Sequence, residues 1–311
     1  MCMFLVNEVL KKYGITEDFK CEEFGISNHQ NTYKIFYKTQ KIFLKKSQKK
    51  FANPVSLYNR YYVLEELKRR NINVPLLIKD IKGNRSNIHN NACIEIYQWL
   101  DIKPCFEKGF YSLVNNLCRL FEAYSEIPIP AAYYSDRAIS IYRSMLINDI
   151  KNYKYEFYDD CFNKQEIIIH AMSYFEHASK NIEQILVELP LCYIHGDLNK
   201  TNIGYSNEDF YVFDFDTTRL GFILEDIAFI FYDIVITESV EDEVLYKTKY
   251  YIESVNKIFP FVNLDLILFF LVKRLLTILS SYRDIKKRGD SIFLDESYLK
   301  GLEKMIRIFE L

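Results

Sequence analysis

The sequence predicts an α+β protein in which a small β-rich lobe is followed by a larger helical lobe. Within residues 20–46, two runs rich in β-branched and aromatic side chains are separated by three polar residues, a pattern typical of antiparallel strands. Beyond Trp99, apolar residues recur mainly at helical spacing. We therefore expect an N-terminal lobe at residues 1–98 and a C-terminal lobe at 99–311, with the boundary at Gln98 to Asp101.

The N-terminal lobe is expected to begin with a hairpin formed by the two runs, residues 32–37 and 41–45. A helix is predicted next, from Pro54 to about Asn71, because apolar side chains there recur at helical spacing. Further strands are predicted at residues 76–81 and 93–99, on either side of a polar loop.

The C-terminal lobe is predicted to consist mainly of helices, at residues 110–124, 138–157, 165–189, 225–236, 241–258, 264–282 and 298–309. Residues 192–215 interrupt this pattern with two short apolar runs, 193–194 and 211–213, around a polar loop. We expect these runs to form one hairpin-like site embedded between the helices.

The composition narrows the classes of partner. A net charge of −2 and a pI near 6.3 predict no basic face for phosphates, so no nucleic-acid partner is expected. The seven cysteines include no Cys-x-x-Cys pair, which disfavours a disulfide framework or a zinc site. The most apolar stretch, residues 264–279, is interrupted by charged side chains, so we expect a buried helix and no membrane partner. The N-terminus resembles no export signal, so a cytoplasmic protein is expected; no feature predicts the oligomeric state.

The polar loop of residues 192–215 carries a pattern suited to phosphoryl transfer. His195, Asp197 and Asn202 have the spacing H-x-D-x-x-x-x-N, and Asp214 ends the following apolar run. Phosphoryl transfer needs a carboxylate near the attacking hydroxyl and oxygen ligands that hold Mg²⁺ against the nucleotide phosphates. Asp197 and Asn202 can serve these two needs from one loop, and Asp214 can complete the metal site.

These residues resemble the aminoglycoside phosphotransferase and choline kinase superfamily. HGDLNKTN is similar to its catalytic loop, and FDFD to the short strand that carries its metal aspartate. GFILEDIA, with Gly221 and Asp226, looks like the continuation found in type II homoserine kinases and spore-coat-associated kinase-like proteins. The resemblance is strongest over residues 192–230. It implies a bilobal protein-kinase-like fold and an enzyme that uses ATP and Mg²⁺ to phosphorylate a hydroxyl of a small-molecule acceptor, such as an amino alcohol, an amino sugar or a related metabolite.

The resemblance also implies roles for single residues in the catalytic loop. Asp197 would be the catalytic base or would position the acceptor hydroxyl, and Asn202 and Asp214 would be Mg²⁺ ligands. Asp226 would brace the catalytic loop. His195 would orient the loop without transferring protons.

In the N-terminal lobe, the resemblance places a nucleotide site. Lys45, at the end of KIFLK, would contact the α and β phosphates; a solvated lysine at the end of a strand is the alternative. Ser27 and Asn28 would lie at the turn of the hairpin that covers the nucleotide. Gln98 and Leu100, beside Trp99, would offer backbone groups to adenine, with core packing of this stretch as the alternative.

Two positions leave alternatives open. The family's helix usually supplies a glutamate that pairs with the strand lysine, but the expected position falls near Arg60 or Tyr61. Glu65 or Glu66 could replace it, or both could be surface carboxylates. Asp216 is either a third carboxylate near the metal or a loop residue. The alternative function is a non-catalytic kinase-like protein with a structural or spore-coat-associated role.

Overall fold

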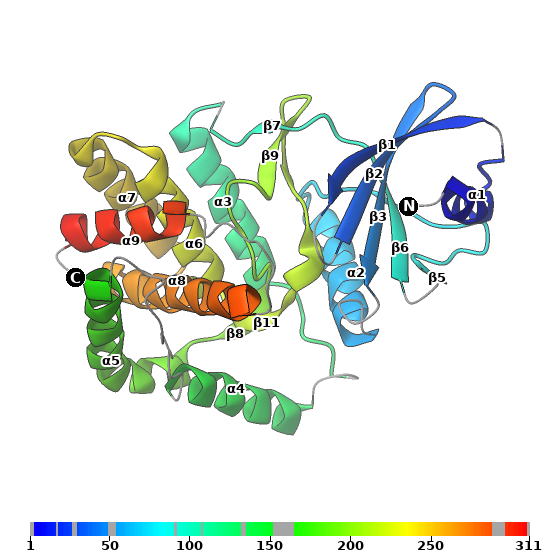
Figure 1. The fold of residues 1–311 in the computed structure, drawn as a ribbon. Helices are drawn as coiled ribbons and strands as arrows, with labels where there is room; N and C mark the ends of the chain where they lie inside the picture. The colour runs from blue at the N-terminus through cyan, green and yellow to red at the C-terminus, as the bar shows by residue number, and fades with distance from the viewer. Residues whose placement is uncertain are drawn as a thin grey trace. The chain divides into compact units, whose positions relative to one another are not determined.

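The computed structural model describes residues 3–16, 18–26, 30–48, 54–89, 92–106, 108–131, 135–151, 165–287 and 296–309. The chain divides into two compact units (Figure 1): a first unit of Met1–Glu107 with Asn202–Thr218, and a second unit of Lys108–Thr201 with Arg219–Leu311. This division differs from the single boundary after residue 98 that the sequence predicts, because Asn202–Thr218 belong to the first unit.

The first unit is built on an antiparallel sheet with the strand order β1-β2-β3-β6-β4, and β5 also pairs with β6. The strands are β1 (Phe19–Ile26), β2 (Gln30–Tyr37), β3 (Gln40–Gln48), β4 (Leu77–Ile78), β5 (Asn87–His89) and β6 (Ala92–Gln98). β2 and β3 form the hairpin that the two apolar runs predict, with Tyr37 paired to Gln40. The strand predicted at residues 76–81 is shorter than expected, since only β4 forms there.

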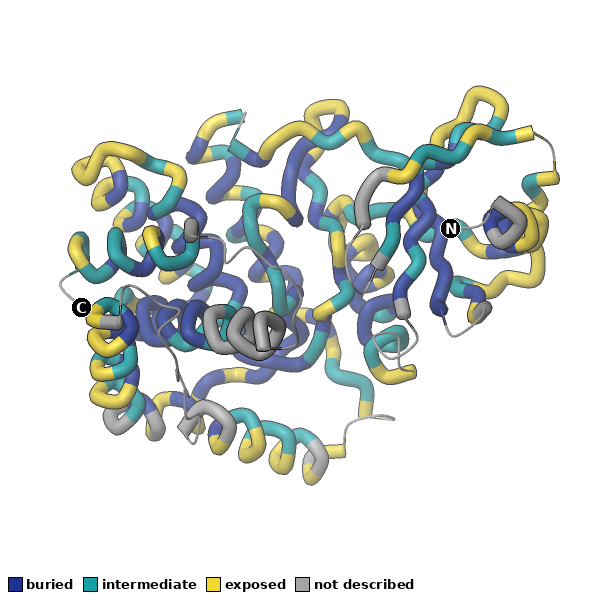
Figure 2. The backbone as a smooth tube through the Cα atoms, viewed as in Figure 1, coloured by how far each residue is buried: buried dark blue, intermediate teal, exposed yellow. Residues whose placement is uncertain are grey.

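The two faces of this sheet have different characters because strand side chains alternate. One face contributes Ile42 and Leu44 of β3 and Ile94 and Ile96 of β6 to a buried apolar cluster with α1 (Met3–Lys12), a helix that no sequence pattern predicted. The same strands turn the opposite face toward α2 (Pro54–Arg69) in Figure 1. Figure 2 shows the central strands as buried segments.

A smaller sheet in the first unit explains why Asn202–Thr218 belong there. Its order is β10-β9-β7, formed by β7 (Lys103–Pro104), β9 (Ile203–Ser206) and β10 (Asp209–Val212). β7 lies so close to β9 that a Cβ atom on Gly204 would lie 2.5 Å from the Lys103 carbonyl oxygen. The apolar run 211–213 pairs with β9, whereas residues 193–194 pair with β11. The expected single hairpin was therefore wrong.

The second unit is mainly helical. Its helices are α3 (Phe110–Ser125), α4 (Asp136–Lys151), α5 (Gln165–Glu188), α6 (Leu224–Thr237), α7 (Glu241–Asn256), α8 (Leu264–Lys287) and α9 (Glu296–Phe309). These bounds confirm the helices predicted from apolar spacing, except that residues 152–157 of the second one lie outside the described residues. Residues 193–194 belong to β8 (Leu191–Ile194), which pairs antiparallel with β11 (Arg219–Phe222).

Two helices form much of the core of the second unit. Nearly every residue of α6 is buried, and the first half of α8 is buried on most of its surface. Figure 2 shows α6 and the first half of α8 as largely buried segments. Within the described ranges, none of the helices is both long and apolar enough to cross a membrane.

Candidate active site

The loop that follows β8 is held by a buried carboxylate of α6. Asp226, which is only 1% exposed, accepts hydrogen bonds from the backbone N–H groups of His195 (2.7 Å) and Gly196 (2.9 Å). Gly196 has φ = 80°, a conformation that side chains disfavour, so a glycine suits this turn. Burial raises the pKa of Asp226 above its usual value, although the two backbone donors favour the charged form.

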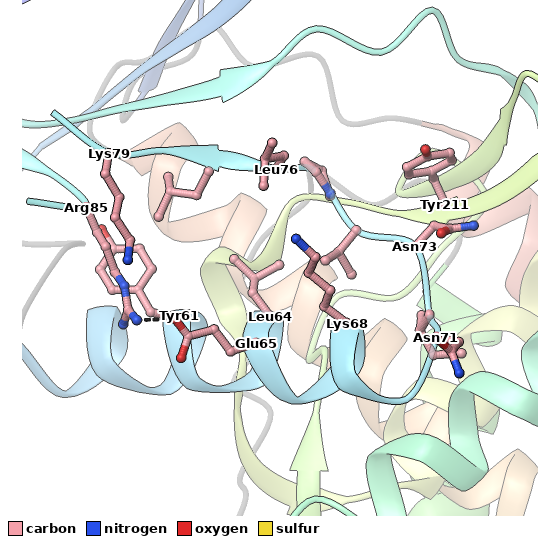
Figure 3. A pocket seen from close by; sticks show the side chains of 14 residues that line it. Tyr61, Leu64, Glu65, Lys68, Asn71, Asn73, Leu76, Lys79, Arg85 and Tyr211 are labelled. Atoms are coloured by element: carbon pink, nitrogen blue, oxygen red, sulfur yellow. Dashed lines mark hydrogen bonds and ion pairs between the residues drawn. The ribbon is translucent and has the colours of Figure 1, made fainter. Parts of the chain in front are cut away.

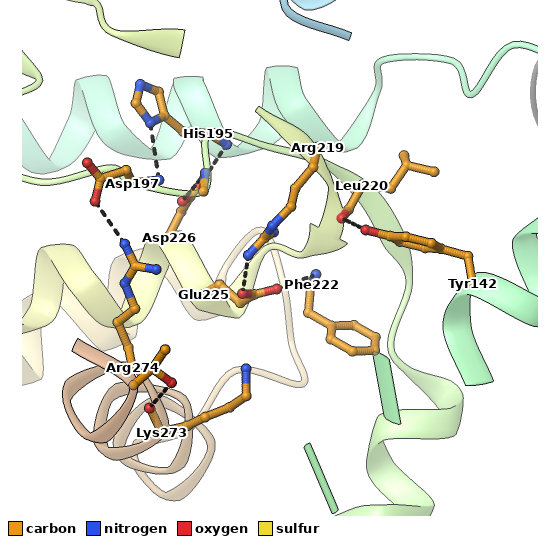
Figure 4. A network of polar contacts seen from close by, with 12 residues as sticks. Tyr142, His195, Asp197, Arg219, Leu220, Phe222, Glu225, Asp226, Lys273 and Arg274 are labelled. Carbon is orange, nitrogen blue, oxygen red and sulfur yellow. Dashed lines mark hydrogen bonds and ion pairs between the residues drawn. The ribbon is translucent and has the colours of Figure 1, made fainter. Parts of the chain in front are cut away.

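His195 orients the same loop from inside the protein. Its side chain is fully buried, and its Nδ1 atom accepts a hydrogen bond from the backbone N–H of Asp197 at 3.3 Å (Figure 4). This contact requires a lone pair on Nδ1. The geometry suits an orienting histidine better than one exposed for proton transfer.

Asp197 forms an ion pair that the sequence did not predict. The Oδ1 atom of Asp197 lies 2.9 Å from Nη2 of Arg274 on α8, and the two side chains are 37% and 34% exposed (Figure 4). Both groups are therefore open to solvent and can meet a ligand. Arg274 is a charged residue within the apolar stretch 264–279. A charged side chain in such a stretch is the signal that could have identified it as a functional residue.

Gly221 and a second ion pair lie in β11 and at the start of α6. Nη2 of Arg219 lies 2.7 Å from Oε2 of Glu225, and a Cβ atom on Gly221 would lie 2.4 Å from Ile194 Cδ1 and 2.9 Å from Glu225 Oε1. A side chain at this position would therefore require the ends of these neighbouring side chains to move. Burial alone raises the pKa of Glu225, but the neighbouring Arg219 and Lys273 outweigh it, so the pKa is lowered.

A further carboxylate of α6 holds the middle of the loop. Asp233 is buried and accepts a hydrogen bond from the backbone N–H of Lys200. Burial raises the pKa of Asp233 to about 7, against the effects of Lys200. The ε-amino group of Lys200 lies 3.4 Å from Thr237 Oγ1, so both the first turn and the last residue of α6 contact the loop.

In the first unit, Lys45 lies among carboxylates. The side chain is 5% exposed, and its Nζ atom lies 2.7 Å from Asp214 Oδ1 and 2.7 Å from Asp216 Oδ1. Burial alone lowers the pKa of Lys45, but the two carboxylates outweigh it, so the pKa is raised and the lysine stays charged. A lysine merely solvated at a strand end does not fit this burial.

Arg60 stands where the resemblance leads one to expect a glutamate. It is buried on α2, and its Nη1 atom contacts Asp216 Oδ1 and lies 2.9 Å from Glu95 Oε2. The sequence of contacts Lys45, Asp216, Arg60 and Glu95 alternates positive and negative charge. Asp216 is therefore more than a loop residue, because it joins the lysine of β3 to the arginine of α2.

Glu95 completes this cluster from the strand next to Lys45. The two residues are directly paired across β3 and β6, and the Glu95 side chain is buried. Oε1 of Glu95 also accepts hydrogen bonds from the hydroxyls of Tyr61 (2.8 Å) and Tyr97 (3.1 Å). A glutamate between two isoleucines in a strand is the signal that could have pointed to it.

The two alternative glutamates of α2 have other partners. Glu65 pairs with Arg85, and Glu66 pairs with Arg69 and Arg70. Neither pairs with Lys45 in this structure. Glu66 is also buried, so its interpretation as a surface carboxylate was wrong.

Asn202 and Asp214 come from neighbouring parts of the first unit. The backbone N–H of Phe213 donates to the Asn202 carbonyl at 3.0 Å, and Asp214 then adopts a left-handed conformation with φ = 65°. Such backbone strain is found at functional sites when surrounding structure maintains it. The Asp214 side chain is 42% exposed, so its carboxylate is accessible.

The donor atoms at this place fit Mg²⁺. Across the described ranges no group of three or more His, Cys, Asp or Glu side chains is arranged to hold a metal. Asn202 and Asp214 instead offer an amide and a carboxylate, and Mg²⁺ is usually held by one or two carboxylates together with substrate phosphates.

The positions expected for the nucleotide base have ordinary local contacts. The backbone N–H of Gln98 donates to the Leu76 carbonyl at 2.8 Å, and Leu100 is half-buried just beyond β6. The Trp99 indole N–H donates to Asp101 at 2.7 Å. Adenine binding by Gln98 and Leu100 stays a prediction. Ser27 and Asn28 lie outside the described residues.

The chain matches a known family of phosphotransferases. A family model described as "Phosphotransferase enzyme family" matches residues 20–251. No curated protein sequence matches the chain.

Solved structures with a similar fold cover nearly the whole chain. A spectinomycin phosphotransferase in complex with ADP and spectinomycin has a TM-score of 0.68 at 16% identity, covering 99% of this chain and 98% of that one. An amicoumacin kinase with AMP-PNP and Ca²⁺ has a TM-score of 0.65 at 14% identity, covering 97% and 92%. A microcompartment-associated aminopropanol kinase has a TM-score of 0.62 at 13% identity, covering 98% and 94%. These similarities confirm the kinase-like α+β fold.

Proposed function

Because the chain belongs to the phosphotransferase enzyme family, we propose that it is a small-molecule kinase that transfers the γ-phosphoryl group of ATP, with Mg²⁺, to a hydroxyl group. The observation that carries this proposal is the buried Lys45 between Asp214 and Asp216. A lysine is rarely buried unless it is paired, and this one is held beside accessible oxygen ligands.

On the nucleotide side, Lys45 would contact the phosphates and stabilise their negative charge. Asn202 and Asp214 would hold Mg²⁺, and the chemistry that the metal would supply is neutralisation of charge on the phosphates. Asp216 keeps Lys45 in place through its contacts with Lys45 and Arg60. Asp216, Arg60 and Glu95 together hold Lys45 in position, a role that a single glutamate on the helix usually has in the family.

On the acceptor side, Asp197 positions the attacking hydroxyl and accepts its proton. A general base must lie within hydrogen-bond reach of the proton that it removes, so the orientation of the Asp197 carboxylate matters. Arg274 fixes that orientation by its ion pair with Oδ1, and Asp226 and His195 fix the backbone beneath it. Arg274 is therefore proposed as a positioning residue.

The acceptor is proposed to be an amino alcohol, an amino sugar or a related metabolite. The similar structures are named for spectinomycin, amicoumacin and aminopropanol, which are small molecules of different sizes. Their diversity supports a small-molecule acceptor without favouring one of them. Helices α3 to α5 are proposed to select it.

A non-catalytic function is the second candidate, and the observation that favours it is Arg60 in place of the expected glutamate. The buried cluster weakens that argument because Lys45 still has carboxylate partners. The candidate bases and ligands Asp197, Asn202 and Asp214 also argue for catalysis.

The test is a screen of ATP consumption with the purified protein and Mg²⁺ across amino alcohols, aminoglycosides and sugars, with Asp197→Asn in parallel. We expect at least one acceptor to yield a phosphorylated product, and the variant to lose turnover by roughly 10²- to 10⁴-fold. Binding of ATP without product from any acceptor would favour the non-catalytic candidate.

A further inference from the structure

A pocket of about 590 Å³ lies in the first unit, between α2 and the segment that leads into β4. Figure 3 shows α2 along one side and residues 71–79 along the other, with Tyr211 of β10 at one end. The volume lies in the range that holds small organic ligands. None of the residues proposed for phosphoryl transfer lines it.

The pocket has an excess of positive charge. Its lining includes Lys68, Lys79 and Arg85 and a single carboxylate, that of Glu65, which is paired with Arg85. Both lysines are exposed, and neither has an ion-pair partner within the described ranges. In Figure 3, Lys68 extends from α2 and Lys79 from the end of β4, and both ammonium groups point into the space between these elements.

The rest of the lining is largely apolar. Leu64 of α2 is buried at the base, and Leu76 is exposed on the opposite side with 49% of its surface accessible. The half-buried ring of Tyr211 adds an aromatic surface. Ligand pockets typically combine such apolar walls with a few charged groups that fix orientation.

We propose that this pocket binds a small organic anion, with its carboxylate, sulfonate or phosphate group between Lys68 and Lys79 and its apolar body against Leu64, Leu76 and Tyr211. Charge complementarity selects an anion, because the two unpaired ammonium groups leave the pocket with net positive charge. The apolar walls select a ligand larger than a bare inorganic ion. The proposal concerns a second site and does not depend on catalysis.

The test uses the fluorescent probe 1-anilinonaphthalene-8-sulfonate and its uncharged relative N-phenyl-1-naphthylamine. Both are titrated into the full chain in the presence of saturating ADP and Mg²⁺, so that any nucleotide site is occupied. The pocket variant is Lys68→Gln with Lys79→Gln. The matched control is Lys11→Gln with Lys82→Gln, which removes the same charge from two exposed lysines of the first unit outside the lining.

We expect the pocket variant to bind the sulfonate at least roughly tenfold more weakly than wild type, and the control variant to stay within about twofold. The uncharged probe should bind wild type and the pocket variant alike. Thermal unfolding of each variant checks that the fold is intact. Unchanged sulfonate binding in the pocket variant, an equal loss in the control variant, or no sulfonate binding by wild type would each overturn the proposal.

Discussion

Replacing Arg60 by methionine tests whether the buried cluster of α2 and β6 stabilises the first unit. The Arg60 and Glu95 side chains are 3% and 1% exposed, and the substitution leaves the Glu95 charge buried without its guanidinium partner. Breaking a buried ion pair from one side costs about 3–5 kcal/mol. The hydroxyls of Tyr61 and Tyr97 still donate to Glu95, so we expect the lower end of this range, about 3 kcal/mol.

The matched control is Arg85→Met, which removes an arginine from a pair of the same chemical type. Arg85 and Glu65 are 35% and 48% exposed, and pairs of this kind contribute about 1 kcal/mol or less. Urea unfolding followed by circular dichroism gives the change in unfolding free energy for both variants. A loss below about 1 kcal/mol for Arg60→Met, or equal losses in the two variants, would refute the reasoning.

Three further predictions concern other parts of the chain. Gly204→Ala should lower the unfolding free energy by about 1–3 kcal/mol in thermal unfolding, because the added Cβ would lie 2.5 Å from the Lys103 carbonyl oxygen, a backbone atom of β7; an unchanged melting temperature would contradict this. Asp233 has a pKa raised from 3.8 to about 7, so its carboxyl binds more protons in the folded state than in the unfolded state between these values, and its contribution to stability should fall as pH rises from about 4 to 7, by up to about 4 kcal/mol. Asp233→Asn should lose this pH dependence, and an equal slope in the variant would disprove the assignment. Arg274→Met should lower kcat/KM for the acceptor by roughly 10- to 100-fold while leaving ADP affinity within about twofold, and a matching loss of ADP affinity would show that Arg274 does not act through Asp197.

The parts of the fold that follow local patterns could be predicted from the sequence. The β2–β3 hairpin, α2 and the helices of the second unit were predicted because alternation and helical spacing are properties of short segments, whereas α1 was missed. The family expected from residues 192–230 is confirmed by the match over residues 20–251, whereas the closer similarity to type II homoserine kinases stays a prediction.

The pairing of distant segments was not accessible in the same way. Residues 193–194 and 211–213 are both short apolar runs. Neither run contains a local pattern that identifies its partner, although the first pairs with β11 and the second with β9. The first unit combines two segments that are far apart in the sequence, Met1–Glu107 and Asn202–Thr218. A single boundary in the sequence therefore cannot separate the two units.

The candidate site shows the same limit. Arg60, Glu95 and Asp216 are far apart in the sequence, so their ion pairs have no local pattern, although charged residues in buried segments mark them for attention. The same holds for Arg274 and Asp197, which are 77 positions apart. The motifs located the loop together with His195 and Asp226, whereas the contacts of Arg274, Arg60, Glu95 and Asp216 became visible only in the structure.

The most direct test of the proposed kinase mechanism compares Asp197→Ala with Asp214→Ala by calorimetric titration of ATP, with and without Mg²⁺, and by turnover with an identified acceptor. If Asp197 acts on the hydroxyl and Asp214 holds the metal, Asp197→Ala should lose turnover by roughly 10²- to 10⁴-fold and bind ATP nearly as wild type does. Asp214→Ala should lose turnover and also the Mg²⁺-dependent part of ATP affinity. Wild-type ATP binding in both variants, with its Mg²⁺ dependence intact, would contradict the assignment of the two aspartates.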